Sequence, residues 1–277
     1  MKVDGKAITK KSYKVKGDEK IEVEDPSKFF DLQILDEAAW VDLPLIKETS
    51  DRVVVYKPAG VLSHPWSSWS LDVPSVVAWA WHRYKDQFAS QEQDFLDNFL
   101  RIWLVHRLDK DTSGLMIVAK TQKAMQHFQS LFKHKSLYHQ TDQLQKYYKA
   151  LVKATLQGKN FINKIKTYPY LIKEIVKPKN VPLKEFKEWI TIVESVQSLK
   201  GDFYLLNLQL ITGRTHQIRY HLSNQGLKIV GDPLYGVENW NFNLKPYFSK
   251  FFNGEMALEA YRLIFENLNW KLEQIEV

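Results

Sequence analysis

The chain has no cysteine, and it has no long uninterrupted run of apolar residues. Without thiols it can form neither a disulfide bond nor a thiolate metal site. No apolar segment reaches the roughly 20 residues that a membrane-spanning helix needs, and the first residues lack the apolar core of a signal peptide. We therefore expect a cytoplasmic protein with no membrane association, and the absence of cysteine agrees with a reducing compartment.

Metal-ligand patterns are also missing. The sequence has no cluster of carboxylates suited to magnesium, and His216 and His221 are five residues apart, whereas two ligands on one helical face lie four apart. A hydrolase that used Asp and His would need a second carboxylate or a serine motif, which we do not find. We expect no metal and no cofactor.

The charge balance of the chain is positive. Its 277 residues include 39 Lys and Arg against 32 Asp and Glu, which gives a formal net charge of +7. An excess of this sign favours a polyanionic partner, and nucleic acid is the usual one. The length suits one large domain with a small appendage, and 44% hydrophobic residues can build a sizeable core.

The first 45 residues differ in pattern from the rest. Three short strands are expected in residues 1–25, as a small β-rich unit, and residues 26–45 resemble a linker. The remaining segment, 46–277, mixes strand patterns with a few helical ones. The fold class predicted is α+β, built around a largely antiparallel sheet with flanking helices.

Several elements of the large segment are clear from periodicity. Residues 121–135 and 217–224 have helical patterns, and residues 203–211, which alternate over their second half, are expected to form a half-buried strand. The aromatic residues of segment 75–104 are interpreted mainly as core on helical faces. Residues 136–145 are expected to form a long loop.

The most informative stretch is residues 106–120, with the sequence HRLDKDTSGLMIVAK. Asp109 lies between a basic pair and a turn rich in Thr, Ser and Gly, and the apolar run that follows anchors this turn in a core. A carboxylate on a short anchored loop beside an arginine is well suited to act as a nucleophile or general base, because the positive charge favours its ionised form. The simpler interpretation is a structural Asp that pairs with a neighbouring basic residue.

The whole stretch resembles the His-Arg-Leu-Asp-x-x-Thr-Ser-Gly motif of the RluA-type pseudouridine synthases. Three further segments match motifs of that family in its order: 53–60 (VVVYKPAG) with the following His-Pro, 146–152 (KYYKALV), and 213–222 (GRTHQIRYHL) with the later 231–236 (GDPLYG). The resemblance covers the chain from about residue 46 to its end. It implies the pseudouridine synthase fold, with a central RNA-binding cleft across the sheet, and the isomerisation of uridine to pseudouridine in RNA.

The resemblance also implies roles for individual residues. Asp109 would attack the sugar, add to the base or remove a sugar proton, and the sequence leaves these three paths open. Arg219 would pair with Asp109, with phosphate binding as the alternative. Tyr148 would stack on the target base and could take its proton, with a place in the core as the alternative. A uridine in folded RNA must be extruded to be reached, and Arg107 is the candidate to support this step.

Other motif positions are predicted to meet RNA or to shape the cleft: His106, Arg214, Lys57 and His64. A basic middle segment is expected to contribute to an RNA track, through Lys159, Lys164, Lys166, Lys173, Lys177, Lys179, Lys184 and Lys187. Glu259 stands where the family pattern has His or Gln. Residues 1–25 resemble the β-rich half of a small RNA-binding domain found in ribosomal-RNA synthases, so ribosomal RNA is favoured over transfer RNA. A catalytically silent RNA-binding or ribosome-assembly protein is the alternative, and a monomer is expected.

Overall fold

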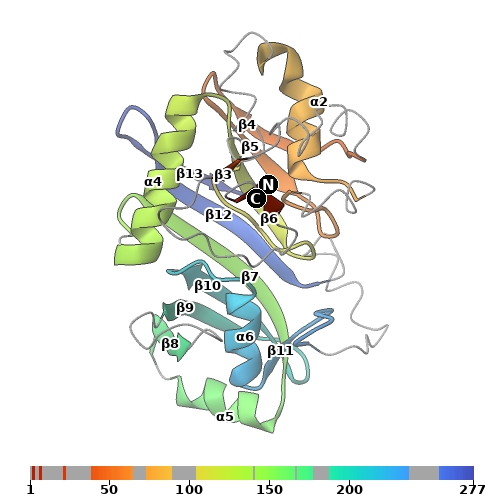
Figure 1. Ribbon diagram of the computed structural model, residues 1–277. Helices are drawn as coiled ribbons and strands as arrows, with labels where there is room; N and C mark the ends of the chain where they lie inside the picture. Colours follow the sequence, from red (N-terminus) through yellow and green to blue (C-terminus); the bar gives the residue numbers. More distant parts are fainter. Residues whose placement is uncertain are drawn as a thin grey trace.

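The computed structural model describes residues 2–3, 6–7, 21–22, 39–64, 73–88, 104–139, 141–165, 167–176, 187–236 and 256–277. Within these residues, most of the chain folds around one large sheet that runs obliquely through the molecule (Figure 1). No helix in the described part is long and apolar enough to cross a membrane.

The large sheet has ten strands, all of which pair antiparallel except for one parallel pair. Eight of them form the order β4-β5-β6-β12-β7-β10-β9-β8, while β11 pairs with β7 and β13 pairs with β12. The strands are β4 (Leu45–Glu48), β5 (Arg52–Lys57), β6 (Ser113–Ala119), β7 (Leu144–Ala154), β8 (Tyr170–Val176), β9 (Lys187–Ser198), β10 (Phe203–Leu210), β11 (Leu227–Ile229), β12 (Leu258–Glu266) and β13 (Leu272–Glu276). The parallel pair joins β6 to β12.

A separate three-stranded antiparallel sheet lies in the N-terminal residues. It consists of β1 (Lys2–Val3), β2 (Lys6–Ala7) and β3 (Ile21–Glu22), in the order β2-β1-β3. Two of the three strands expected in residues 1–25 are thus found in shorter form. The third, at 12–16, lies outside the described residues, as does most of the expected linker.

Four helices are described: α2 (Val76–Phe88), α4 (Gln122–Tyr138), α5 (Leu156–Lys164) and α6 (Gln217–Asn224). Thr121 and Thr155 begin α4 and α5 as N-caps, since each hydroxyl accepts a hydrogen bond from a backbone N–H of the first turn. In Figure 1, α4 and α6 lie on the side of the sheet that faces the viewer.

Strands β5 and β6 form the centre of the core because both of their faces are buried. On one face, Val53 and Val55 share a hydrophobic cluster with Trp79 of α2. On the other face, Val54 shares a second cluster with Phe128 of α4. Strands covered on both faces have continuous apolar sequences rather than alternating ones. This explains the uninterrupted apolar runs in both strands.

The predicted α+β class and the mainly antiparallel sheet are confirmed. The helix expected at 217–224 is found with those bounds, and Trp79, Trp81 and Tyr84 are buried as expected. The long loop predicted at 136–145 is shorter in the structure, and both of its predicted bounds are wrong. Helix α4 continues to Tyr138, and β7 already begins at Leu144.

Candidate active site

A cavity of about 270 Å³ lies between residues of α4 and α6, with residues of β7 as its floor. Among the described residues, five Lys or Arg side chains line it, against a single carboxylate, that of Asp109. The lining cations are Arg107, Lys135, Lys146, Arg214 and Arg219. The electrostatic potential of such a cavity favours an anionic ligand.

The loop that carries Asp109 is fixed on both sides of this residue. On one side, the Ser63 hydroxyl donates to the Leu108 carbonyl at 2.7 Å and accepts from the Leu108 N–H at 3.0 Å. On the other side, the Lys110 carbonyl accepts from the Gly60 N–H and from the Lys57 ammonium, both at 2.9 Å. The carboxylate therefore has a defined position at the cavity wall.

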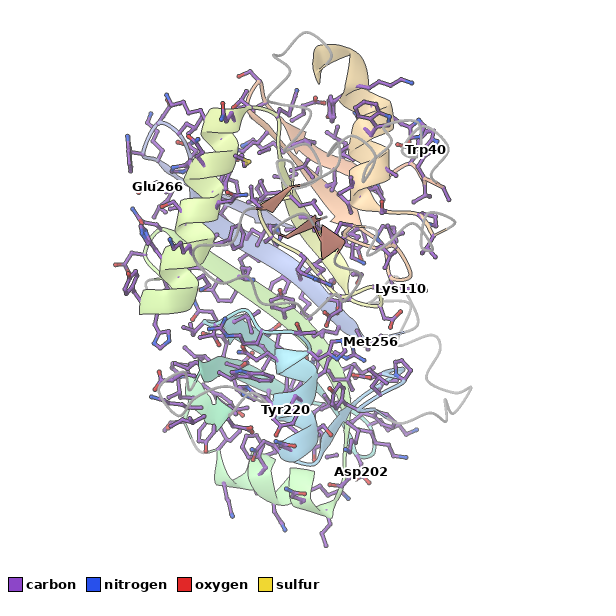
Figure 2. All side chains as sticks on the ribbon, in the orientation of Figure 1. Trp40, Lys110, Asp202, Tyr220, Met256 and Glu266 are labelled. Atoms are coloured by element: carbon purple, nitrogen blue, oxygen red, sulfur yellow. The ribbon has the colours of Figure 1, made fainter. Side chains whose placement is uncertain are left out.

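A guanidinium and an imidazole face the Asp109 carboxylate. Its Oδ2 lies 3.7 Å from an Arg219 guanidinium nitrogen and 3.9 Å from His216 Nε2. The Arg219 side chain is 2% exposed and that of Asp109 is 21% exposed. Figure 2 labels Lys110, which follows Asp109, and Tyr220, which follows Arg219 on α6, and so shows where the two segments lie in the fold. The expected juxtaposition of Asp109 and Arg219 is present.

Arg219 makes its shortest contacts with a different carboxylate. Its Nε and one terminal nitrogen donate to the two oxygens of Asp232, each at 2.7 Å. Asp232 also accepts from the backbone N–H groups of Leu234 and Tyr235. Burial alone would raise the pKa of Asp232, but these hydrogen bonds outweigh it and lower that pKa. The bidentate pair orients the guanidinium and leaves its other terminal nitrogen toward Asp109.

Tyr148 lies on the floor of the cavity, from the inward-facing side of β7. It is 4% exposed. Burial, with a smaller contribution from the nearby Asp109 charge, raises the pKa of Tyr148 well above its ordinary value. The phenol is therefore protonated near neutral pH. This favours the ring as a stacking surface over the phenolate as a proton acceptor.

Arg107 and Arg214 both line the cavity, as the sequence led us to expect. Arg107 is exposed. Arg214 is half-buried, and its Nε is buried without a hydrogen-bond partner. Both guanidinium groups are placed to meet a ligand that enters the cavity.

His106 and Lys57 are held mainly by contacts within the protein: His106 lines the cavity, whereas Lys57 does not. His106 Nε2 accepts from the Ile117 N–H at 2.9 Å, its Nδ1 is buried, and its ring stacks on Phe132. Burial, together with the charge of Lys146, lowers the pKa of His106 well below its usual range. Lys57 is 0% exposed, and its ammonium donates to three backbone carbonyls. Both residues hold the Asp109 loop and the strands beside it.

The structure also shows where His64 and the lysines of the expected RNA track lie. His64 is half-buried and does not line the cavity, although it follows Ser63, which fixes the loop. In the expected RNA track, Lys159 pairs with Asp202 and Lys173 pairs with Glu188, each at 2.6 Å. Lys166, Lys177, Lys179 and Lys184 lie outside the described residues.

Sequence reasoning missed four residues that shape the site: Lys135, Lys146, His216 and Asp232. Lys146 had a usable signal, because it is two residues from Tyr148 on the same strand and so faces the same side. The only sequence signal for Asp232 was its place in a family motif, because no local pattern shows that residues 219 and 232 form a pair. Glu259, the departure from the family pattern, is buried, accepts from the Tyr56 hydroxyl at 2.5 Å and does not line the cavity.

The described residues contain no group of three or more His, Asp or Glu that could hold a metal ion. Comparison with protein families gives a match to the RNA pseudouridylate synthase model over residues 51–224. The chain belongs to this family. The match spans the Asp109 loop, Tyr148 and Arg219, and it confirms the resemblance carried by the motifs.

Curated relatives have similar sequences over the same region. The chain is 32% identical over 197 residues to "Ribosomal large subunit pseudouridine synthase D" of Borreliella burgdorferi, a match that covers 71% of this chain and 55% of that protein. It is 27% identical over 241 residues to the protein of the same name from Buchnera aphidicola, covering 87% of this chain and 68% of that protein. The match thus spans little more than half of the first relative.

Solved structures support the fold. The chain superposes on human RNA pseudouridylate synthase domain containing 1 with a TM-score of 0.55 and 20% identity, covering 85% of this chain and 83% of that one. Human RNA pseudouridylate synthase domain containing 4 gives a TM-score of 0.55 and 20% identity, covering 84% and 87%. The predicted pseudouridine synthase fold is confirmed.

Proposed function

We propose that this protein is an RNA pseudouridine synthase in which Asp109 is the catalytic nucleophile or base. The observation that carries the proposal is the cavity itself. Asp109 is the single carboxylate on its wall in the part of the chain that the structure describes, and it faces Arg219 and His216. It also belongs to the family's central motif. The cationic lining suits RNA, and the family match supports uridine isomerisation as the reaction.

The reaction breaks the bond between sugar carbon 1′ and base nitrogen 1, rotates the base, and joins carbon 5 to carbon 1′. Carbon 5 then loses a proton and nitrogen 1 holds one, so the product is an isomer and no redox partner is needed. Asp109 could begin this sequence at carbon 1′, at base carbon 6 or at the sugar 2′ proton. All three paths use an ionised carboxylate, and the Arg219 guanidinium faces that of Asp109 at 3.7 Å.

Tyr148 and the arginines have separate tasks in this proposal. The Tyr148 ring stacks on the target base and holds it while the base rotates. Extrusion of a nucleotide from a helix costs a few kcal/mol. Arg107, exposed beside the Asp109 loop, supports the extruded conformation, and Arg214 meets the sugar-phosphate backbone.

Ribosomal RNA is the substrate that we favour, with transfer RNA as the alternative. Two of the curated relatives carry ribosomal large-subunit names. We place the catalytic domain at 46–277, a linker at 26–45 and a partial RNA-binding unit at 1–25. The protein would act as a monomer in the cytoplasm, without a cofactor.

Pseudouridine mapping of total RNA from cells with and without the gene tests the function. We expect specific sites to vanish on deletion, to return with the wild-type gene, and to stay absent with Asp109→Asn. Sites that return with Asp109→Asn would remove Asp109 from its role. Loss of no site in any RNA would favour the catalytically silent RNA-binding protein.

A further inference from the structure

Two lysines share the cavity wall that α4 and the start of β7 form. Lys135 lies on α4, three residues after Phe132 and so on the same side of the helix. Lys146 lies on β7, with its Nζ 5.4 Å from the centre of the Phe132 ring. Lys135 is 2% exposed and Lys146 is 7% exposed, and both line the cavity.

Among the described residues, neither ammonium has a carboxylate partner. Lys135 Nζ is buried without any hydrogen-bond partner. In the part of the chain that the structure describes, no carboxylate forms an ion pair with either lysine, because Asp109 faces Arg219 and His216 instead. Two other titratable groups lie near the pair: Tyr148, on the same side of β7 as Lys146, and His106, whose cationic form Lys146 disfavours.

Burial of such groups is unfavourable unless something compensates for the charge. Burial lowers the pKa of Lys135 to about 7, with repulsion from Lys146 as a smaller cause, and burial lowers the pKa of Lys146 to about 8. Packing alone does not require amines here, since an apolar side chain would fill the same space at lower cost. An anion with several oxygen acceptors would satisfy both groups.

We propose that Lys135 and Lys146 form a phosphate subsite, which holds an RNA backbone phosphate next to the nucleotide on which Asp109 acts. The choice of RNA rests on the function proposed above. Lys146 contacts the phosphate directly. Lys135 lies behind it and attracts the phosphate by its charge, which acts strongly because the protein interior has a low dielectric constant.

The geometry of β7 supports this placement. Lys146 and Tyr148 point to the same side of the strand, about 7 Å apart along it. A base stacked on Tyr148 therefore has its neighbouring phosphate within reach of Lys146. The subsite would fix the register of the RNA so that the sugar of the target nucleotide meets Asp109.

The test uses the full chain with ¹³C-labelled lysine side chains and NMR titration. In chloride buffer, we expect two lysine signals to titrate near the lowered values. Inorganic phosphate at equal ionic strength should move both midpoints toward the ordinary lysine pKa of about 10.4. Lys146→Met should abolish the response of Lys135 to phosphate. Lys149→Met is the matched control, because Lys149 lies on the other side of β7, over the Tyr261 ring, and should leave the response unchanged.

A second arm distinguishes RNA phosphate from free phosphate. Binding of the dinucleotide UpU is compared with that of its methylphosphonate analogue, whose linking group has no charge. Wild type should prefer UpU by roughly tenfold, as expected for a charge-assisted contact, and Lys146→Met should have no preference.

Midpoints that phosphate does not move would overturn the subsite. A response to inorganic phosphate without any preference for UpU would leave a free-anion site and overturn the RNA assignment. None of these measurements needs turnover. A chain that binds phosphate at the lysines but forms no pseudouridine would therefore contradict the proposed function and not the subsite.

Discussion

The ion pair between Arg219 and Asp232 should be one of the largest electrostatic contributions to stability in this protein. Both side chains are buried, with 2% and 0% exposure, and the pair is bidentate at 2.7 Å. Asp232→Asn keeps the shape but removes the charge, and it leaves a buried guanidinium whose remaining neighbouring carboxylates, Asp109 and Asp111, act on it only through their charge. Breaking a buried pair in this way costs about 3–5 kcal/mol.

The chain provides a matched control at its surface. Asp202 pairs with Lys159 at 2.6 Å, a shorter distance, but these side chains are 46% and 39% exposed. Exposed pairs contribute about 0–1 kcal/mol because water and salt screen them. Asp202→Asn should therefore change the free energy of unfolding by less than about 1 kcal/mol. Urea denaturation of both variants and wild type measures the two values.

The pH dependence gives an independent check. The pKa of Asp232 is lowered in the folded protein, so the pair contributes fully above the ordinary aspartate pKa of about 3.9. This contribution is lost as the pH falls through the lower folded value, and wild type and Asp232→Asn should converge there. Equal losses for Asp232→Asn and Asp202→Asn at neutral pH would refute the argument that burial decides the strength of these pairs.

Three other substitutions test the supports of the site. Gly114→Ala would place a Cβ 2.4 Å from the Ala260 carbonyl oxygen at a φ of +126°. Measured by thermal denaturation, it should lower the free energy of unfolding by more than about 2 kcal/mol. Gly60→Ala is the control: Gly60 has a φ of +86° but open space around its Cβ position, so this substitution should lower the free energy of unfolding clearly less. Lys57→Met removes the ammonium that donates to three backbone carbonyls and leaves the Lys110 carbonyl with only its bond from the Gly60 N–H. It should reduce isomerisation more than RNA affinity, and equal losses would contradict a role in holding the loop. Lys135→Met should stabilise the fold. Because the pKa of Lys135 is lowered to about 7, the unfolded chain binds more protons between that pH and about 10.4. The gain in the free energy of unfolding, measured by urea denaturation, should therefore be larger at about pH 6 than at about pH 9.5, by roughly 3 kcal/mol. A gain that does not change with pH would contradict this.

Local patterns predicted much of this fold because they report directly on burial and periodicity. Helix 217–224 has polar and apolar residues at helical spacing, and β10 alternates over much of its length, so both were predictable. The extension of α4 to Tyr138 was not, because the motif spacing suggested a loop while the local sequence continues as a helix.

The site was predictable where motif residues face the cavity, and unpredictable where contacts join distant segments. Asp109, Tyr148 and Arg219 follow from the motifs. The pairing of Arg219 with Asp232 depends on how the chain returns after α6. The burial of Lys57 depends on a turn that brings three carbonyls to one ammonium. A lysine in a sequence looks like a surface residue, and only the fold shows that this one is internal.

The most direct test of the proposed function is pseudouridine formation by the purified protein on total RNA from cells that lack the gene. Wild type, Asp109→Asn and Asp111→Asn are compared by mass spectrometry of the digested RNA. Asp111 lies two residues after Asp109 and does not line the cavity. We predict that wild type and Asp111→Asn form pseudouridine at the same sites, and that Asp109→Asn is slower by roughly a thousandfold or more. Conversion by Asp109→Asn at the wild-type rate would contradict the assignment of Asp109 as the catalytic carboxylate.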